Sequence, residues 1–419
     1  MKFIRILSLT VLGSFSWSAS AETVVKILHI EKVPGVLAIW QEAAQEYEKA
    51  HPGVKIQFDY LENEAFKAKL PTLLQSKDKP SFFHSWGGGV MKEQVESGVC
   101  QDITEAIKGD FADSFYPAGV QNFVVNGKSY GVPNDVGPIV FWYNKDLTSK
   151  AGVDPTQIKT WDDFVAAVKK VKAAGITPIA AGGADKWPLH FYPAMLMMRV
   201  LGKDDFDAML KDTKQGLAGQ GPLKAWQLYK ELSDLKPFQD GYQSAKYPDA
   251  AGYFHDGKAA FHLMGNWDVS AGRDASVNKK GLSDEQLGWF NFPTVGGGKG
   301  KADDIFASVD GWLVSKDAPK ETIDLLKVVL GKETQDKLAA AGLSIPMVKG
   351  TSASIKTPYI RALAEEAENS SWIQIAMDQL LGPDTGRLFN DQAAAIAAGT
   401  TTPEAAVKAI EASWKQNQG

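Results

Sequence analysis

In the first third of the chain, the spacing of hydrophobic residues alternates between the pattern of a β-strand and that of an α-helix. A β-branched run at 24–30 is followed by helical spacing at 37–51, and strand patterns at 54–61 and 81–86 enclose a helical pattern at 66–75. Short strands that alternate with helices predict βαβ units and a mostly parallel sheet. Ligands of such open sheets usually bind beyond the carboxyl ends of the strands.

The rest of the chain keeps both patterns and becomes mostly helical after Glu321. The class is therefore α/β, and 419 residues are enough for two lobes. We expect helices at 161–174, 191–201 and 222–235, strands at 176–180, 259–264, 288–292 and 305–315, and helix breaks at 342–346 and 382–383.

The N-terminus has the parts of an export signal. Lys2 and Arg5 precede an apolar stretch at 6–17, and Ala19-Ser20-Ala21 gives the small-x-small pattern that signal peptidase reads. We therefore expect residues 1–21 to be a signal peptide that is cleaved after Ala21 and directs the protein to the periplasm. The apolar stretch is shorter than the roughly 20 residues of a transmembrane helix.

Composition narrows the class of partner. Lys and Arg total 45 and Asp and Glu total 50, for a net charge of −5. Nucleic acids and anionic membranes select basic surfaces, so neither is expected as a partner. The single cysteine, Cys100, excludes an internal disulfide.

Enzyme motifs are weak or incomplete. The segment from Gly252 to Lys258 matches most of a phosphate-binding loop, but Ala259 stands where the hydroxyl that holds magnesium is required. The six histidines lack His-x-x-x-His spacing and no Cys-x-x-Cys occurs, so we expect no metal site and no cofactor. A pair of glycosidase carboxylates hidden among the many acidic residues stays open as an alternative.

The most informative residues are tryptophans beside carboxylates in short, often glycine-containing turns. Pyranose rings present flat C–H patches to aromatic faces, and their hydroxyls form strong hydrogen bonds with carboxylates. Four segments combine these features and predict a sugar site: Ser-Trp-Gly-Gly-Gly (85–89), Asp-Lys-Trp-Pro (185–188), Gly-Asn-Trp-Asp (265–268) and Asp-Gly-Trp (310–312).

Several motifs also follow one another in a specific order along nearly the whole chain after position 21. They are Phe-Phe-His-Ser-Trp-Gly-Gly-Gly (82–89), Tyr-Gly-Val-Pro-Asn-Asp (130–135), Trp-Tyr-Asn-Lys-Asp-Leu (142–147), Thr-Trp-Asp-Asp-Phe (160–164), Phe-His-Asp-Gly-Lys-Ala-Ala-Phe (254–261), Met-Gly-Asn-Trp-Asp (264–268) and Ser-Val-Asp-Gly-Trp (308–312). In this order they resemble the extracellular sugar-binding proteins of ATP-binding-cassette importers, the maltose-binding-protein-like group.

The resemblance implies a two-lobed periplasmic binding protein fold of type II, with the ligand cleft between the lobes. By analogy the N-lobe comprises 22–134 plus 309–350, and the C-lobe comprises 135–308 plus 351–419. The resemblance also implies that hinge closure captures a carbohydrate, and the several tryptophans, which allow more than one sugar ring, favour a small oligosaccharide. The protein would then deliver it to the membrane permease subunits of the importer as a monomer without enzymatic activity.

The resemblance also assigns roles in the cleft. Trp86 would face the sugar from the N-lobe, and Trp187 and Trp267 from the C-lobe, whereas Asp135 and Asp310 lie near the lobe crossings. The expected ligand-binding residues are Glu31, Trp86, Asp135, Lys186, Trp187, Trp267, Asp268, Asp310 and Trp312.

Alternatives remain for single residues and for the function. Glu31 also fits a surface charge at a helix entry, Asp268 a helix N-cap, and Lys186 a solvated lysine, whereas Trp142 and Trp161 are assigned to the core. The rival functions are a secreted glycoside hydrolase and a binding protein for a non-sugar solute such as a polyamine.

Overall fold

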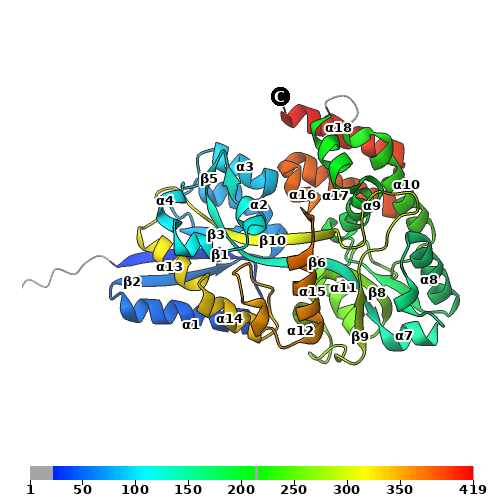
Figure 1. Cartoon of the computed structure of the whole chain (residues 1–419), viewed down its shortest axis with the longest axis horizontal. Helices are drawn as coiled ribbons and strands as arrows, with labels where there is room; N and C mark the ends of the chain where they lie inside the picture. The colour runs from blue at the N-terminus through cyan, green and yellow to red at the C-terminus, as the bar shows by residue number, and fades with distance from the viewer. Residues whose placement is uncertain (1–21, 213–215, 419) are drawn as a thin grey trace, which may run out of the picture.

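The computed structural model describes residues 22–212 and 216–418, so the expected signal peptide at 1–21 lies outside the described residues. Two α/β lobes lie side by side, and long strands run from one into the other (Figure 1). We call the lobe with the N-terminal strands the first lobe and its neighbour the second lobe. The α/β class and the two-lobed arrangement agree with the sequence analysis.

Over the described residues, a mixed sheet of nine strands has the order β2-β1-β3-β10-β6-β8-β7, with β11 beside β10 and β9 beside β6. The pairs β1–β2, β1–β3 and β7–β8 are parallel, as the alternation of strands and helices predicts. The strands are β1 (Thr23–His29), β2 (Val54–Tyr60), β3 (Phe82–Ser85), β4 (Val124–Val125), β5 (Lys128–Ser129), β6 (Gly131–Asn144), β7 (Thr177–Ala180), β8 (Ala259–Gly265), β9 (Leu287–Phe290), β10 (Ile305–Val314) and β11 (Ile373–Ile375).

Strands β6 and β10 connect the lobes. The first half of β6 pairs antiparallel with β10, whereas its second half pairs with β8 and β9 of the second lobe. The C-terminal part of β10 pairs with β3 of the first lobe. Asp135 and Asp310 are direct partners between β6 and β10, and the register shifts immediately afterwards, between Asp310 and Gly311. A third segment, 344–347, pairs with β6 on its other side.

Helices cover the sheets of both lobes, and the C-terminal helices touch both. α16 and α17 contact α3 of the first lobe as well as α9 of the second lobe. The helices are α1 (Pro34–Ala50), α2 (Asn63–Leu74), α3 (Gly88–Glu96), α4 (Thr104–Ile107), α5 (Asp110–Asp113), α6 (Pro117–Gln121), α7 (Lys145–Lys150), α8 (Trp161–Ala173), α9 (Trp187–Lys211), α10 (Gln220–Asp234), α11 (Tyr247–His255), α12 (Asp268–Ala275), α13 (Glu321–Val329), α14 (Lys332–Ala340), α15 (Pro358–Asn369), α16 (Met377–Leu380), α17 (Gly382–Ala398) and α18 (Pro403–Gln418), with 3₁₀ turns at Pro155–Gln157, Gly216–Ala218 and Ser352–Ser354.

Local sequence explains why helix α8 starts where the sequence analysis expects it. Thr160 accepts a hydrogen bond from the backbone N–H of Asp163 at 3.2 Å, and Asp163 accepts one from the backbone N–H of Thr160 at 2.9 Å. This reciprocal capping box satisfies two donors that a helix start leaves free. The first helical residue, Trp161, and Trp142 of β6 are each 1% exposed, so both belong to the core as expected.

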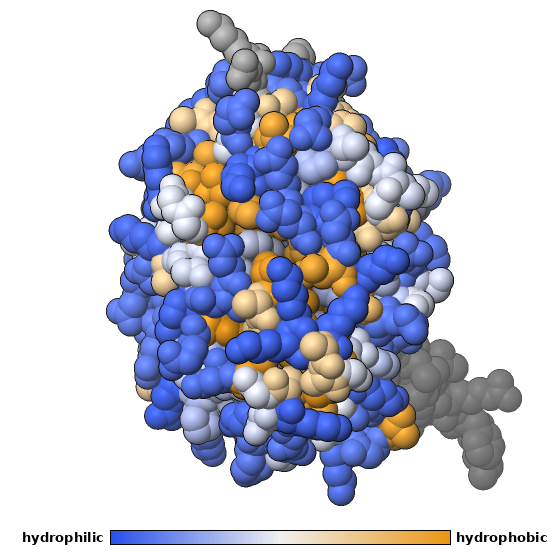
Figure 2. Space-filling view, turned by 90° about the vertical axis from the view of Figure 1, so that its right-hand side faces the viewer, coloured by the Kyte–Doolittle hydropathy of each residue, from blue (hydrophilic) through white to orange (hydrophobic). Residues whose placement is uncertain are grey.

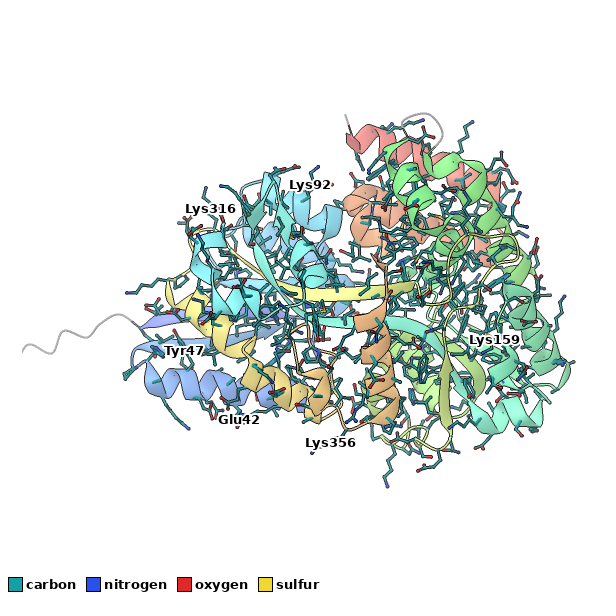
Figure 3. All side chains as sticks on the ribbon, viewed as in Figure 1. Glu42, Tyr47, Lys92, Lys159, Lys316 and Lys356 are labelled. Atoms are coloured by element: carbon teal, nitrogen blue, oxygen red, sulfur yellow. The ribbon has the colours of Figure 1, made fainter. Side chains whose placement is uncertain are left out.

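The surface is more polar than the core. The end face of the second lobe carries mainly hydrophilic side chains, with hydrophobic areas interspersed among them (Figure 2). Among the described residues, no helix combines the length and the apolar character that a membrane span requires. Outer positions such as Glu42 on α1, Lys92 on α3 and Lys159 before α8 lie on different sides of the molecule (Figure 3).

Candidate binding site between the lobes

A cavity of about 430 Å³ lies between the two lobes. Its walls come from the ends of β1 and β3 in the first lobe, the first turns of α9, α11 and α12 in the second lobe, and the crossing strands β6 and β10. Six of the nine expected site residues line it: Glu31, Trp86, Asp135, Trp187, Trp267 and Asp310.

Two carboxyl groups lie side by side on the crossing strands. Asp135 and Asp310 are direct partners in the register of β6 and β10, so their β-carbons are about 5 Å apart. Ser344 donates a hydrogen bond to Asp135 at 3.0 Å, and Ser308 donates one to Asp310. Burial and then the neighbouring Asp310 raise the pKa of Asp135 well above its usual value, and burial raises the pKa of Asp310 to about 7.

Glu31 follows β1 and brings a third carboxyl group to the same place. Its Oε1 accepts hydrogen bonds from the backbone N–H groups of Lys32 at 2.7 Å and Val33 at 2.6 Å, directly before α1. Glu31 therefore fits both alternatives from the sequence analysis, because it lies at the start of a helix and also lines the cavity. Burial raises the pKa of Glu31, and its charge in turn raises the pKa of both aspartates. We call Glu31, Asp135 and Asp310 the acidic floor.

The first-lobe wall is formed by Trp86, which follows β3. Its ring meets His84 edge-on with centroids 4.6 Å apart and Phe66 at 5.8 Å. The Nζ of Lys67 lies 5.3 Å from the centroid of the Trp86 ring, a distance at which an ammonium and an indole face attract each other. Trp86 is partly exposed and lines the cavity.

The glycines after Trp86 have a packing reason. A β-carbon on Gly88 would stand 2.8 Å from the carbonyl oxygen of Gln379, and one on Gly89 would stand 2.6 Å from that of Leu380. These positions lie at the contact between α3 and the α16–α17 segment. The Gly-rich turn therefore lets two backbones meet closely behind the tryptophan.

The opposite wall belongs to the second lobe. Trp187 begins α9 and packs against Tyr247 of α11, with ring centroids 5.1 Å apart and planes inclined by 55°. Asp185 fixes this pair, because its carboxylate accepts the backbone N–H of Tyr247 at 2.7 Å. Trp187 and Tyr247 are partly exposed and line the cavity.

Trp267 sits between β8 and α12 and rests on backbone. A β-carbon on Gly137 of β6 would stand 2.4 Å from Cζ3 of the indole, and one on Gly265 would stand 2.0 Å from the same atom. Two glycines from different strands thus leave room for the ring beside the crossing. An aromatic ring held flat on rigid backbone is a suitable platform for the C–H face of a sugar.

A comparison with protein families gives a direct assignment. The family model described as bacterial extracellular solute-binding protein matches residues 33–336, well over half of the chain. The chain belongs to this family. The family resemblance seen in the sequence is thereby confirmed, and so is the expectation of a receptor that is not an enzyme, because solute-binding proteins are non-enzymatic.

Individual relatives agree with this assignment. An uncharacterised ABC transporter extracellular-binding protein from Pyrococcus horikoshii is 26% identical over 248 residues, covering 58% of this chain and 55% of its own length. An arabinooligosaccharide-binding protein from Bacillus subtilis is 31% identical over 184 residues, covering 43% and 40%. The chain spans about half the length of the curated relatives it matches first.

Solved structures share the fold. A chitin oligosaccharide binding protein superposes with a TM-score of 0.85 at 24% identity and covers 95% of this chain and 100% of its own. A protein studied for xylan utilisation by Caldanaerobius polysaccharolyticus gives a TM-score of 0.84 at 24% identity, covering 93% and 99%. The expected periplasmic binding protein fold is therefore confirmed.

Asp268 of this solute-binding protein lies outside the cavity lining, contrary to the sequence expectation. It is 1% exposed, and its carboxylate lies 3.3 Å from Nε2 of His255 and 3.4 Å from Nε2 of His262. It starts α12 without capping it, so the N-cap alternative fails as well. Burial by itself would raise the pKa of Asp268, but the two histidines outweigh it and lower this pKa. Burial by itself would lower the pKa of His262, but the charge of Asp268 outweighs it and raises this pKa.

The placement of Asp268 suggests an indirect contribution to the site. Burial and then the nearby charge of Asp268 raise the pKa of Tyr247, which lines the cavity. Asp268 also directly follows Trp267 in the chain. It therefore lies behind the second-lobe wall and supports it.

Trp312 and Lys186 also lie outside the cavity lining. Trp312 is 1% exposed and packs against Trp40 and Phe82, with ring centroids 5.4 and 5.3 Å apart. Trp312 stands two residues beyond Asp310 on β10 and opposite His84 of β3, inside the first lobe. Lys186 is exposed and forms a 2.6 Å ion pair with Asp391 of α17.

Several residues that line the cavity were not expected from the sequence. Lys67 of α2 and Asp378 of α16 lie 3.8 Å apart, and His190 of α9 lies 4.0 Å from Asp378. Tyr247 and Asn266 also line the cavity. Asn266 lies inside the expected Gly-Asn-Trp-Asp turn, but nothing in the sequence brings Lys67 and Asp378 together. Within the described part of the chain, no cluster of three or more His, Cys, Asp or Glu residues could hold a metal ion.

Proposed function

We propose that this chain is the periplasmic receptor of an ABC importer and that it captures a small oligosaccharide by hinge closure. The observation that carries the proposal is the cavity with tryptophan walls from both lobes, Trp86 on one side and Trp187 and Trp267 on the other. Aromatic faces and carboxylates together suit a pyranose, which offers C–H patches and hydroxyl groups. Similar proteins that are named for binding arabinooligosaccharide and chitin oligosaccharide support a saccharide.

Closure follows from the division of the site between the lobes. A ligand that contacts Trp86 and Trp267 at the same time binds the closed form more tightly than the open form, and it therefore shifts the equilibrium toward closure. The hinge consists of β6, β10 and the segment 344–347. The closed particle then docks on the permease subunits, whose ATPase partners supply the energy.

Calorimetry with a panel of mono- and oligosaccharides tests ligand capture. We expect one saccharide per chain, bound without chemical change. Trp187→Ala should abolish or strongly weaken binding. The matched control is Trp414→Ala, because Trp414 is also partly buried but lies on α18, away from the cavity lining. Hydrolysis products that scale with protein would support the glycoside hydrolase instead, and failure of every saccharide together with tight spermidine binding would support a polyamine receptor.

Spin labels test the hinge. Lys92 on the first lobe and Lys159 on the second lobe are exposed and lie outside the cavity lining (Figure 3). With Cys100→Ala as background, labels at Lys92→Cys and Lys159→Cys should change their separation when saccharide is added. An unchanged distance distribution at saturating ligand would contradict closure.

The compartment and the oligomeric state are tested separately. N-terminal sequencing of the exported protein should begin at Glu22 if cleavage follows Ala21. Light scattering of the purified protein should give the mass of a monomer. A retained leader or a dimer would contradict these two parts of the proposal without affecting ligand capture.

A further inference from the structure

The cavity between the lobes is lined by more acidic than basic side chains. Its lining includes seven carboxylate side chains and three lysines. Of the lysines, Lys67 already lies 3.1 Å from Glu64 and 3.8 Å from Asp378. Lys32 lies 5.5 Å from the ring centroid of Tyr60, and Lys279 is exposed. These lysines are therefore engaged or exposed away from the crossing strands.

The acidic floor has no positive partner among the described residues. Its three carboxyl groups interact with one another, with the hydroxyls of Ser344 and Ser308, and with backbone N–H groups. The imidazole of His29 accepts the backbone N–H of Glu31 at Nδ1 and adds no counter-charge at neutral pH, because burial lowers the pKa of His29 to about 4. A buried cluster of like charges without a counter-charge is costly.

A second observation points to a donor-rich ligand group at the same place. Asn266 is 7% exposed and lines the cavity, and its Oδ1 accepts no hydrogen bond from the described residues. This oxygen would stand 3.3 Å from a β-carbon on Gly137, two residues along β6 from Asp135. An unused acceptor therefore lies beside the carboxylates. Together they call for a group that donates several hydrogen bonds and carries positive charge.

We propose that the ligand is an amino sugar, or an oligosaccharide that contains one, and that its protonated amine binds at the acidic floor. An ammonium group has three donors and no acceptor, which matches the carboxylates and the free oxygen of Asn266. The electron-rich faces of Trp267 and Trp86 favour a cation as well as a sugar ring. This inference rests on the proposed function, because it names the saccharide class for the same cavity.

Matched ligands that differ at one position test the proposal. Cellobiose, the β-1,4-linked glucosamine dimer and its di-N-acetylated form share ring and linkage but carry a hydroxyl, an ammonium or an amide at C2. The pairs glucose and glucosamine, and galactose and galactosamine, extend the comparison to single rings. At neutral pH and low salt we expect amine ligands to bind at least roughly tenfold more tightly than their hydroxyl partners, because charge-assisted hydrogen bonds are stronger.

The outcomes separate this inference from the proposed function. If hydroxyl or N-acetyl ligands bind as tightly as the amines, the amino-sugar inference fails and saccharide capture stands. If spermidine binds and no saccharide does, both fail.

A variant of the acidic floor tests whether the preference for amine ligands arises there. Asp310→Asn should reduce the affinity for the amine ligand by roughly tenfold and change that for the hydroxyl partner less. The control is Glu42→Gln on α1, an exposed carboxylate 3.4 Å from Lys337 and outside the cavity lining (Figure 3). Equal losses for both ligands in Asp310→Asn, with thermal unfolding intact, would overturn the assignment of the amine to the floor.

Discussion

The indole of Trp267 lies on the backbone of Gly265, where a β-carbon would stand only 2.0 Å from Cζ3 of the ring. No real contact is that short, so any side chain at position 265 must displace the ring. The position of the Trp267 ring beside the crossing strands is thus set by a residue that does not itself line the cavity.

Gly265→Ala should therefore weaken saccharide binding while the fold persists. We expect a loss of roughly tenfold in affinity, or about 1.4 kcal/mol, because the platform moves out of position. Gly296→Ala is the control, since a β-carbon there meets nothing within 4 Å. Calorimetry and thermal melts measure both variants. Normal affinity in Gly265→Ala would mean that Trp267 does not contact the ligand.

Trp267→Ala should reduce binding affinity and leave stability nearly unchanged, whereas Trp161→Ala should do the opposite. Trp267 is partly exposed in the cavity lining, whereas Trp161 is 1% exposed in the core of the second lobe. Truncation of the buried ring should cost about 3–5 kcal/mol of unfolding free energy with little specific loss of binding. Trp267→Ala should bind poorly and melt nearly as the wild type does. Denaturant unfolding and calorimetry separate the two cases, and reversed profiles would exchange the assignments.

Asp135→Asn should impair both contact and closure. Asp135 lies at the crossing, between Asp310 on β10 and Ser344 on the third connecting segment. The substitution replaces a charge-assisted hydrogen bond by a neutral one, at a cost of about 1.5–3 kcal/mol in binding. In small-angle scattering the variant should become compact only at correspondingly higher saccharide concentration. Wild type that does not become compact at saturation would contradict the hinge mechanism.

Asp310→Asn should stabilise the ligand-free protein at alkaline pH. Because burial raises the pKa of Asp310 to about 7, the folded state holds this proton more tightly than the unfolded state. Stability therefore falls as the pH rises from about 4 through 7. The variant lacks this loss, so its free energy of unfolding should exceed that of the wild type by about 4 kcal/mol at pH 8 and match it near pH 4. Melting curves across this range test the sign, and a variant less stable at pH 8 would contradict it.

Asp268→Asn should destabilise the second lobe in a pH-dependent way. Because folding lowers the pKa of Asp268, this residue stabilises the folded state above the unfolded pKa of about 4. Because folding raises the pKa of His262, the stabilisation by this residue is lost as the pH rises above about 6.5. At pH 6 the variant should lose about 3 kcal/mol of unfolding free energy, because the buried His262 loses its counter-charge. Wild type should lose stability between pH 6 and 9 and the variant should not. Parallel pH profiles would show that the pair is not ionised.

Local periodicity predicted many elements and missed the one that builds the site. Strands β1, β2 and β8 and helices α8 and α10 lie within a few residues of their expected bounds, because each has its own apolar repeat. Strand β6 was not expected, since Pro133, Gly137 and Pro138 interrupt its pattern. It persists because each part of it pairs with β10, β8 or β9, which are distant in the sequence, and this pairing is a property of the tertiary structure.

The site shows the same limit at the level of single side chains. The tryptophan-containing turns predicted where the cavity lies. They could not show that Trp267 lines it whereas its neighbour Asp268 is buried in the second lobe. In the same way, Asp310 lines the cavity, whereas Trp312, two residues further along β10, is buried in the first lobe. Spacing in sequence does not show which side chains will bury a residue, nor does it show the approach of Lys67 to Asp378.

The position of β10 between β3 and β6 also orders events during synthesis. Strand β3 is buried along its whole length, yet the neighbour that covers its free edge begins only at Ile305, more than 200 residues later. Until that strand has left the ribosome, the first lobe has an apolar sheet edge with unpaired backbone groups. The second-lobe strands β6 to β9 are all synthesised by Phe290, whereas the first lobe cannot finish its sheet as a continuous piece of chain and must complete its folding late.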